Sequence, residues 1–260
     1  MDKNLNRNGM IGVIQVRMGS TRLPGKALKE IMGKPLLSYL YERVCAASSL
    51  DRVVIATAAG ARNQPIVDFA KANHIGCVAG SEQDLVDRFC ETAEKFVAKA
   101  LVRVTGDCPF ADPSVVDQVT GTYLKNSDRY DYVGNVVRPT YPDGLDVDVL
   151  PRSTLEKMDR EVKDPFWREW LTGYLRERPN EYRIGGVENA EDLSALRWTV
   201  DYEEDLRFTE EIFSRLYPKK KIFLMKDILE LLEKEPAIAE INKKYTRDAA
   251  YAAAKKEAGK

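Results

Sequence analysis

The sequence predicts an α/β fold with a mostly parallel, Rossmann-like sheet flanked by helices. In the first 125 residues, short apolar runs alternate with longer stretches whose apolar residues recur at helical spacing. Strands that alternate with helices form parallel sheets, because each helix carries the chain back across a face of the sheet. The apolar runs are nearly continuous, which is typical of strands buried on both faces. We expect strands at residues 11–16, 52–57, 76–79 and 100–105, and helices at 35–47, 64–73, 83–98 and 113–125.

The helix expected at 35–47 illustrates the pattern. Leu36, Leu37, Leu40 and Val44 fall on one face, and Pro35 stands at the first turn, where its missing N–H group costs nothing.

The second half of the chain is less regular. We expect strands at 130–135, 145–150, 182–187 and 196–200, and helices at 153–162, 166–178, 203–216, 226–234 and 238–244, with an Ala/Lys-rich, helical or frayed tail at 247–260. Asp205 falls in the first turn of the helix at 203–216, where a carboxylate suits the helix dipole. We interpret residues 1–260 as one domain, with an inserted lobe at about 130–190.

The composition excludes several classes of protein. The 260 residues carry 40 Lys+Arg and 41 Asp+Glu, a formal charge of −1, so we expect neither a nucleic-acid partner nor a polybasic membrane binder. The single histidine, His74, cannot build a His-rich metal site. The four cysteines form no CxxC motif, which excludes a zinc knuckle or a thioredoxin-like site, and four free thiols in a large chain favour a reducing compartment. We expect a cytoplasmic protein without a membrane span.

The loop after the first strand carries the strongest chemical signal. Residues 17–26 read RMGSTRLPGK and include Arg17, Arg22, Lys26 and two glycines. Glycines let backbone N–H groups approach anionic oxygens, and the three cations supply charge-assisted hydrogen bonds, so the loop predicts a polyphosphate cradle. Its spacing fits neither the Walker pattern nor GxGxxG. A solvated basic turn is the alternative.

Two aspartates follow predicted strands directly. Asp107 comes just after 100–105, and Asp201 just after 196–200. Carboxylates at neighbouring strand ends form a plausible Mg²⁺ site, since Mg²⁺ takes one or two protein carboxylates and fills its other positions with phosphate and water. Each aspartate could instead cap the turn that follows it.

Five motifs, in order along nearly the whole chain, resemble those of the sugar-activating cytidylyltransferases. These are the acylneuraminate and 3-deoxy-manno-octulosonate enzymes, and above all the branch of the spore coat polysaccharide biosynthesis protein F. The motifs are RMGSTRLPGK (17–26), GSExDxxxR (80–88), TGDCP (105–109), YPDGLDV (141–147) and LRWTVDYxEDL (196–206).

The resemblance implies a nucleotidyltransferase fold and a Mg²⁺-dependent reaction. CMP would pass from CTP to an acidic, ulosonic-acid-like sugar with release of pyrophosphate, for surface glycan synthesis. It implies catalytic roles for Arg17, Lys26, Asp107 and Asp201, and assigns the two aspartates to the metal. A homodimer, with the 130–190 lobe as its interface, is also implied.

The remaining site residues follow from the same motifs and from topology. Besides Arg17 and Lys26, the nucleotide is expected to contact residues of the first loop and of three strand ends: Met18, Gly19, Ser20, Arg22, Ala58, Ser81 and Thr105. Ala58 and Ser81 rest on topology alone, and Thr105 stands where the better-known relatives often have a base-reading Gln. The acceptor is expected at Arg88 and at a lid that includes Tyr141, Asp143 and Asp146.

One segment departs from the branch pattern. Residues 168–174 read REWLTGY where the branch usually reads REHVTPY, so Trp170 replaces His and Gly173 replaces Pro. This helix is expected to shape the acceptor pocket or a dimer contact, so the departure leaves the identity of the acceptor open.

Three other functions are compatible with parts of the sequence. An enzyme of the same fold could use another nucleotide or a small phosphorylated or carboxylated non-sugar acceptor. A non-catalytic nucleotide-binding homologue would not need Asp107 and Asp201. A glycosyltransferase would need a DxD pair at a strand end. Asp146 and Asp148 match that string, but we interpret them as part of the strand at 145–150.

Overall fold

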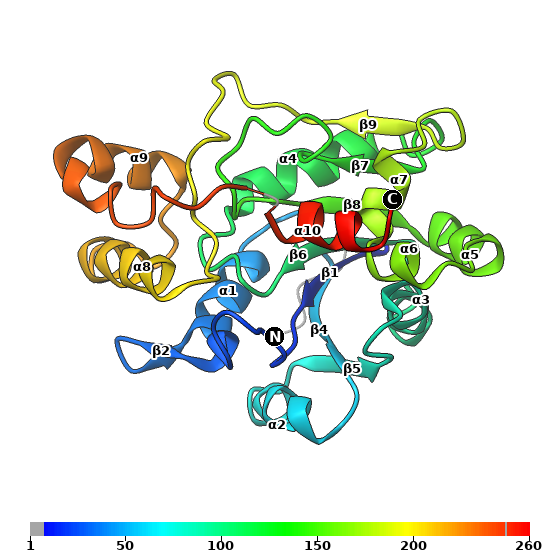
Figure 1. Cartoon of the computed structure of the whole chain (residues 1–260), viewed down its shortest axis with the longest axis horizontal. Coiled ribbons are helices and arrows are strands. Elements are labelled where there is room, and N and C mark those ends of the chain that lie inside the picture. The colour runs from blue at the N-terminus through cyan, green and yellow to red at the C-terminus, as the bar shows by residue number, and fades with distance from the viewer. Residues whose placement is uncertain (1–7, 248) are drawn as a thin grey trace.

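The computed structural model describes residues 8–247 and 249–260, in which helices cover both faces of one central sheet (Figure 1). Within these residues the sheet has seven strands in the order β5-β4-β1-β6-β8-β7-β9. The first four run parallel, β8 runs antiparallel to both its neighbours, and β9 is parallel to β7. Their bounds are β1 (Met10–Gln15), β4 (Arg52–Ala58), β5 (Gly76–Gly80), β6 (Ala100–Thr105), β7 (Tyr132–Gly134), β8 (Asp148–Pro151) and β9 (Ile184–Gly186).

The predicted α/β class is confirmed. The four apolar runs of the first half become β1, β4, β5 and β6, and they are buried because helices lie on both sides. On β1, Met10 and Ile14 face one core cluster while Ile11 and Val13 face the other. A strand buried on both faces has no polar side to show, which is why its sequence is continuously apolar.

Two groups of helices cover the two faces. One core cluster includes residues of α1 (Leu36–Cys45), α2 (Gln64–Ala72), α4 (Pro113–Leu124), α8 (Glu203–Leu216) and α9 (Met225–Lys234). The other includes residues of α3 (Leu85–Lys95), α5 (Arg152–Glu161), α6 (Pro165–Glu169) and α7 (Leu171–Arg176). The C-terminal helix α10 (Ala249–Glu257) belongs to neither cluster.

Aspartates cap helices beside the carboxyl edge of the sheet. The Asp84 side chain accepts a hydrogen bond from the Asp87 N–H at the start of α3, at 2.9 Å. Asp112 does the same for Ser114 at the start of α4, at 2.8 Å, and its second oxygen accepts from the Met225 N–H at 2.6 Å. Capping satisfies backbone donors that a helix leaves open, and here one cap also ties α4 to α9.

Three expected elements differ from the structure. Residues 196–200 are extended but form only an isolated bridge, because their N–H groups bond to loops: Trp198 to the Asp143 carbonyl at 2.6 Å and Val200 to the Asp107 carbonyl at 2.8 Å. The helix expected at 238–244 is replaced by the short 3₁₀ helix η3 (Pro236–Ile238) and turns. The helix expected at 166–178 is interrupted at Trp170 (φ −101°, ψ 47°), which separates α6 from α7.

The structure adds an unexpected hairpin, β2 (Glu30–Ile31) and β3 (Lys34–Pro35), turned by Met32 and Gly33, which both have positive φ. It also adds the 3₁₀ helices η1 (Lys26–Leu28) and η2 (Ala61–Asn63). Across residues 8–247 and 249–260, no helix is both long and apolar enough to cross a membrane.

Gly144 allows the close approach that positions residues 196–200. Its φ is +110°, and a Cβ atom there would lie 2.6 Å from the Trp198 carbonyl carbon and 2.8 Å from the Thr199 nitrogen. Gly144→Ala therefore adds a backbone clash to an unfavourable φ, and we expect it to lower the free energy of unfolding by about 3 kcal/mol or more.

Gly33→Ala is the matched control, since Gly33 also has positive φ (+74°) but nothing lies within 4 Å of its added Cβ. We expect a loss of only about 1 kcal/mol there. Urea denaturation of both variants measures the difference, and equal losses would show that the clash is relieved at no cost.

Candidate active site

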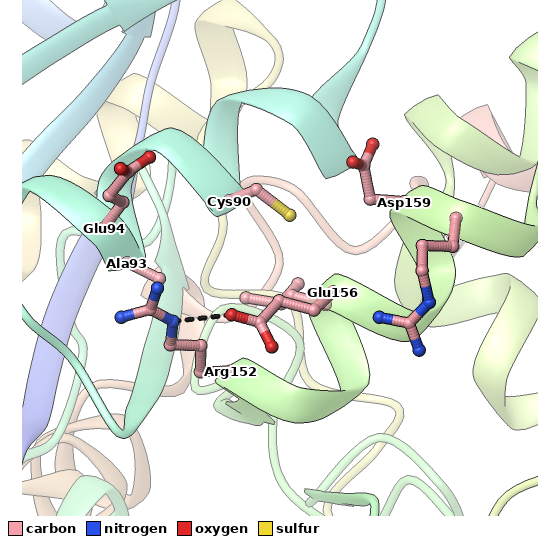
Figure 2. Close-up of a pocket in the computed structure, with 8 residues that line it drawn as sticks. Cys90, Ala93, Glu94, Arg152, Glu156 and Asp159 are labelled. Atoms are coloured by element: carbon pink, nitrogen blue, oxygen red, sulfur yellow. Dashed lines mark hydrogen bonds and ion pairs between the residues drawn. The ribbon is translucent and has the colours of Figure 1, made fainter.

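One of the surface pockets is not a candidate for the active site. It measures about 270 Å³ and lies between α3 and α5 (Figure 2). Its charges pair locally, as in the Arg152–Glu156 contact of 2.8 Å, and burial raises the pKa of the Cys90 thiol to about 12, which keeps it protonated at neutral pH. It shares no lining residue with the two clefts described next.

The candidate site lies at the carboxyl edge of the sheet, where β1 and β6 end side by side. Gln15 and Thr105, the last residues of these strands, pair in register. The loop 17–26 and the loop that contains Asp107 therefore leave the sheet together. Ligands of open α/β sheets bind at such strand ends, which is where the predicted site residues of these two loops stand.

Lys26 connects the two predicted metal aspartates. Its Nζ atom lies 2.9 Å from Asp107 Oδ2 and 2.9 Å from Asp201 Oδ1, and it also donates to the Val200 carbonyl at 2.7 Å. All three ammonium protons thus have acceptors. Gly25, in the left-handed conformation (φ 71°, ψ 11°), precedes η1 and directs Lys26 toward the aspartates.

The charges at this point stabilise one another. Burial alone would raise the pKa of Asp107, but the Lys26 ammonium outweighs it and holds that pKa well below its usual range. The pKa of Asp201 is lowered as well: burial and the Asp107 charge oppose the shift, and Lys26 and Arg22 produce it. Burial disfavours the charged lysine, yet the two carboxylates raise the pKa of Lys26. All three groups are therefore charged at neutral pH.

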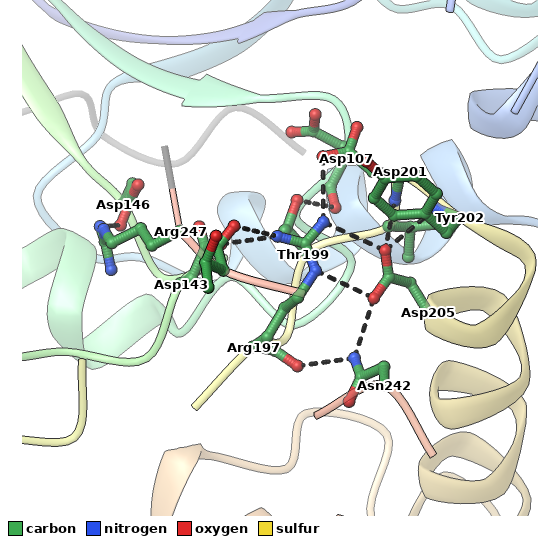
Figure 3. A network of polar contacts seen from close by, with 12 residues as sticks. Asp107, Asp143, Asp146, Arg197, Thr199, Asp201, Tyr202, Asp205, Asn242 and Arg247 are labelled. Atoms are coloured by element: carbon green, nitrogen blue, oxygen red, sulfur yellow. Dashed lines mark hydrogen bonds and ion pairs between the residues drawn. The ribbon is translucent and has the colours of Figure 1, made fainter. Parts of the chain in front are cut away.

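Arg197 organises a second group of carboxylates (Figure 3). Its guanidinium makes two 3.1 Å hydrogen bonds to Asp205, one to Asp143 and one to Asp201. Asp205 is fully buried and also accepts from the N–H groups of Asp201 (2.9 Å) and Tyr202 (3.0 Å). Arg197 thus links the predicted metal ligand Asp201 to the predicted acceptor residue Asp143.

Two adjoining clefts open at these residues. The first, which we call the loop cleft, measures about 390 Å³ and is lined by the 17–26 loop and by strand ends; it includes Arg17, Gly19, Ser20, Arg22, Lys26, Arg88, Thr105, Asp107 and Asp201. The second, the carboxylate cleft, measures about 340 Å³ and includes Asp143, Asp146, Thr199, Tyr202, Lys244 and Tyr245. Arg22, Thr105, Asp107, Trp170, Asp201 and Ala250 line both.

Four predicted site residues line neither cleft. The Met18 N–H donates to Asn63 Oδ1, and Ala58 is fully buried at the end of β4. The Ser81 hydroxyl accepts from the Asp84 N–H, and the buried Tyr141 hydroxyl donates to Gln118. These contacts hold the loops that carry the site.

Two of the predicted site residues that line the loop cleft, Arg17 and Arg88, already have partners within the protein. Arg88 is 3% exposed and donates to the Ser81 and Glu82 carbonyls, while Arg17 pairs with Glu169 at 3.4 Å. Burial, and to a smaller extent the nearby Arg17 charge, lower the pKa of Arg88.

Asp107 and Asp201 fit a magnesium ion by the chemistry of their donors. They present carboxylate oxygens to a common cation, the Lys26 ammonium, beside a cleft that is also lined by Arg22 and Arg88. Mg²⁺ is bound in this way, by one or two carboxylates together with substrate phosphates and water. Among the described residues, no cluster of three or more His, Cys, Asp or Glu side chains offers a metal cage formed by protein alone.

Arg197, Asp205 and Asn242 were not identified as site residues from the sequence. Asn242 donates to the Arg197 carbonyl and to Asp205. Arg197 and Asp205 stand within the motif at 196–206, which was the available signal. Asn242 stands in a segment expected to be helical, so nothing marked it.

Known proteins are similar to this chain over most of its length. The family model for cytidylyltransferases matches residues 11–253. The spore coat polysaccharide biosynthesis protein SpsF of Bacillus subtilis is 28% identical over 89% of this chain and 97% of its own. A 3-deoxy-manno-octulosonate cytidylyltransferase of Chlamydia trachomatis is 32% identical over 77% of this chain and 92% of its own. The structure of a cytidylyltransferase from Leptospira borgpetersenii has a TM-score of 0.85 and 29% identity, covering 92% of this chain and 98% of that chain.

Asp143 gives the site a pH-dependent stability. Burial and the Asp146 carboxylate raise the pKa of Asp143 to about 7. In the unfolded chain an aspartate titrates near pH 3.9. Between about pH 4 and pH 7 the folded state therefore binds a proton that the unfolded state has lost, and stability falls as the pH rises.

Asp143→Asn removes this titration. We expect the free energy of unfolding of the variant, relative to wild type, to rise from pH 4.5 to pH 7.5. Asp117→Asn is the matched control: hydrogen bonds from Ser49 and Ser48 outweigh burial and lower the pKa of Asp117, so above about pH 5 this carboxyl is ionised in both the folded and the unfolded chain, and the difference from wild type should stay nearly constant over this range. A difference for Asp143→Asn that stays constant with pH would contradict the raised pKa.

Proposed function

The chain belongs to the cytidylyltransferase family and is a nucleotidyltransferase, and we propose that it transfers CMP from CTP to a hydroxyl group of an acidic, ulosonic-acid-like sugar. Pyrophosphate is the second product. The observation that carries this proposal is the convergence of Lys26, Asp107 and Asp201 beside a cleft lined by further cations.

The loop cleft would bind the triphosphate. Arg22 and Lys26 lie within it as charged donors, and Gly19 and Ser20 bring the loop backbone to its wall. In phosphoryl transfer, charge develops on the phosphoryl oxygens, so fixed cations lower the barrier by electrostatic stabilisation. Asp107 and Asp201 would hold Mg²⁺, which when bound neutralises phosphate charge and lowers the pKa of the attacking hydroxyl.

The bond changes are those of a nucleotidyl transfer. The acceptor oxygen forms a bond to the α-phosphorus, and the bond from that phosphorus to the bridging oxygen of the β-phosphate breaks. The hydroxyl proton passes to the carboxylate side of the site, where Asp143, with its pKa near 7, can accept it in the carboxylate cleft. The site thus needs no histidine.

The acceptor would occupy the carboxylate cleft. Asp143 and Asp146 can accept hydrogen bonds from sugar hydroxyl groups, while Lys244 and Arg22 at the wall suit an acidic group. Because Asp107 and Asp201 line both clefts, an acceptor in the carboxylate cleft meets a nucleotide in the loop cleft at the two aspartates.

A small acceptor that carries an ammonium group is a second candidate. Asp143 and Asp146 share the carboxylate cleft with the stacked rings of Tyr202 and Tyr245, 3.8 Å apart. Carboxylates and aromatic faces both attract cations. Amine-bearing acids therefore belong in the acceptor panel.

The test is a screen of pyrophosphate release with the four nucleoside triphosphates, Mg²⁺, and a panel of ulosonic acids, amino sugars and small phosphorylated acids. We expect turnover with CTP and an ulosonic acid. Turnover confined to an amine or a non-sugar acceptor would replace the acceptor assignment, and turnover with another nucleotide would replace CTP.

Lys26→Met should lower kcat/KM by about 100-fold or more, because it removes the cation between two carboxylates and from the phosphate site. Lys29→Met is the matched control. Lys29 lies three residues further on and makes only a 3.5 Å contact with the exposed Glu203, so its loss should change kcat/KM less than about threefold. Equal effects of the two substitutions on pyrophosphate release would contradict the role of Lys26.

A further inference from the structure

The C-terminal helix α10 forms part of the wall of the site. Ala249, Ala250 and Tyr251 line the carboxylate cleft, and Ala250 also lines the loop cleft. In Figure 1, α10 (red) lies across the front of the sheet, over β6 and β8. The last helix of the chain thus reaches residues that lie more than a hundred positions earlier in the sequence.

Tyr251 packs where α6 meets α7, against Trp170 and Gly173, and we call these two residues the seat of Tyr251. Its ring is 5.1 Å from the ring of Trp170, the residue that separates these helices. A Cβ atom at Gly173 would lie 2.6 Å from the Tyr251 Oη atom, so an alanine there would require the tyrosine ring to shift. The hydroxyl donates to Glu177.

Both residues of this seat are positions where the sequence departs from the resembled pattern. Trp170 stands in place of His, and Gly173 in place of Pro. Both departures contact the same side chain, Tyr251.

Polar contacts at the surface hold α10 in place. Within α10, all of whose residues are described, no residue is buried. Lys255 pairs with Glu177 at 2.7 Å, and Lys260, just beyond the helix, pairs with Asp164. Such pairs each contribute about 0–1 kcal/mol, and segments with few buried apolar contacts open at low free-energy cost.

We propose that α10 is a strap that opens to admit the acceptor and closes over the carboxylate cleft, and that Tyr251 limits the size of the acceptor that the closed cleft can hold. The part of this proposal that concerns the acceptor rests on the function proposed above. When closed, the strap narrows the path of water to the nucleotide, so that transfer to the acceptor competes better with hydrolysis.

The seat is tested first, without any substrate, by hydrogen–deuterium exchange of the α10 amides. Gly173→Ala should displace Tyr251 and speed exchange across α10 by about tenfold or more. Alanine favours a helix more than glycine does, so the substitution cannot act by weakening α7. Gly121→Ala in α4 is the control, because nothing lies within 4 Å of its added Cβ, and it should leave α10 exchange unchanged.

The size limit is tested by kinetics with two ulosonic acids, one of eight and one of nine carbon atoms. Tyr251→Ala should raise the kcat/KM ratio of the larger to the smaller acceptor by about tenfold or more, with the KM for CTP changed less than about twofold. Tyr251→Phe keeps the ring and should keep the wild-type ratio.

Exchange in wild-type α10 as fast as in an unfolded peptide, or no change with Gly173→Ala, would overturn the strap. An unchanged acceptor ratio in Tyr251→Ala would overturn the size limit. If neither acid is turned over by wild type while Gly173→Ala still releases α10, the acceptor assignment fails and the strap stands.

Discussion

The ammonium group of Lys26 between Asp107 and Asp201 is the interaction on which the site depends. Asp107 lies 81 positions after Lys26 in the sequence, and Asp201 lies 175 positions after it. The lysine therefore connects the loop after β1 with the end of β6 and with the segment that leads into α8. Two half-buried carboxylates would repel each other and take up protons without a cation between them. With Lys26 in place both stay ionised, which is the state that the proposed metal site requires.

Arg197 extends this constraint to the carboxylate cleft. It uses its donors on Asp143, Asp201 and Asp205, and the Asp205 carboxylate in turn fixes the backbone that carries Asp201. This network explains why residues 196–200 are not a strand of the sheet. Their backbone and side chains serve the loops at Asp107 and Asp143 instead. The network therefore links Asp143 in the carboxylate cleft to Asp201, which lines both clefts.

The sequence allowed the parallel half of the sheet and the placement of Asp107 to be predicted, because a continuous apolar run followed by a polar residue specifies both a buried strand and its end. Asp201 was placed correctly beside it from a segment that is extended, although not a strand. The hydrogen bonds of Arg197 to three carboxylates could not be predicted. A buried arginine needs such partners, and here the fold brings one of them from a distant part of the chain. Nor could the position of α10 be predicted: an Ala/Lys-rich tail has no apolar face to indicate where it packs, and only the folded chain brings Tyr251 to Gly173.

We propose that Asp107 and Asp201 would hold a metal ion when the nucleotide binds, and that the Lys26 ammonium would then move to the phosphates. Crystals grown with CTP and Mn²⁺, a metal with an anomalous signal, test it directly. We expect one anomalous peak within coordination distance of both carboxylates and of the nucleotide phosphates, with the Lys26 ammonium moved onto the phosphates. A metal bound to the nucleotide alone, with Lys26 still bridging the two aspartates, would contradict the proposed metal site.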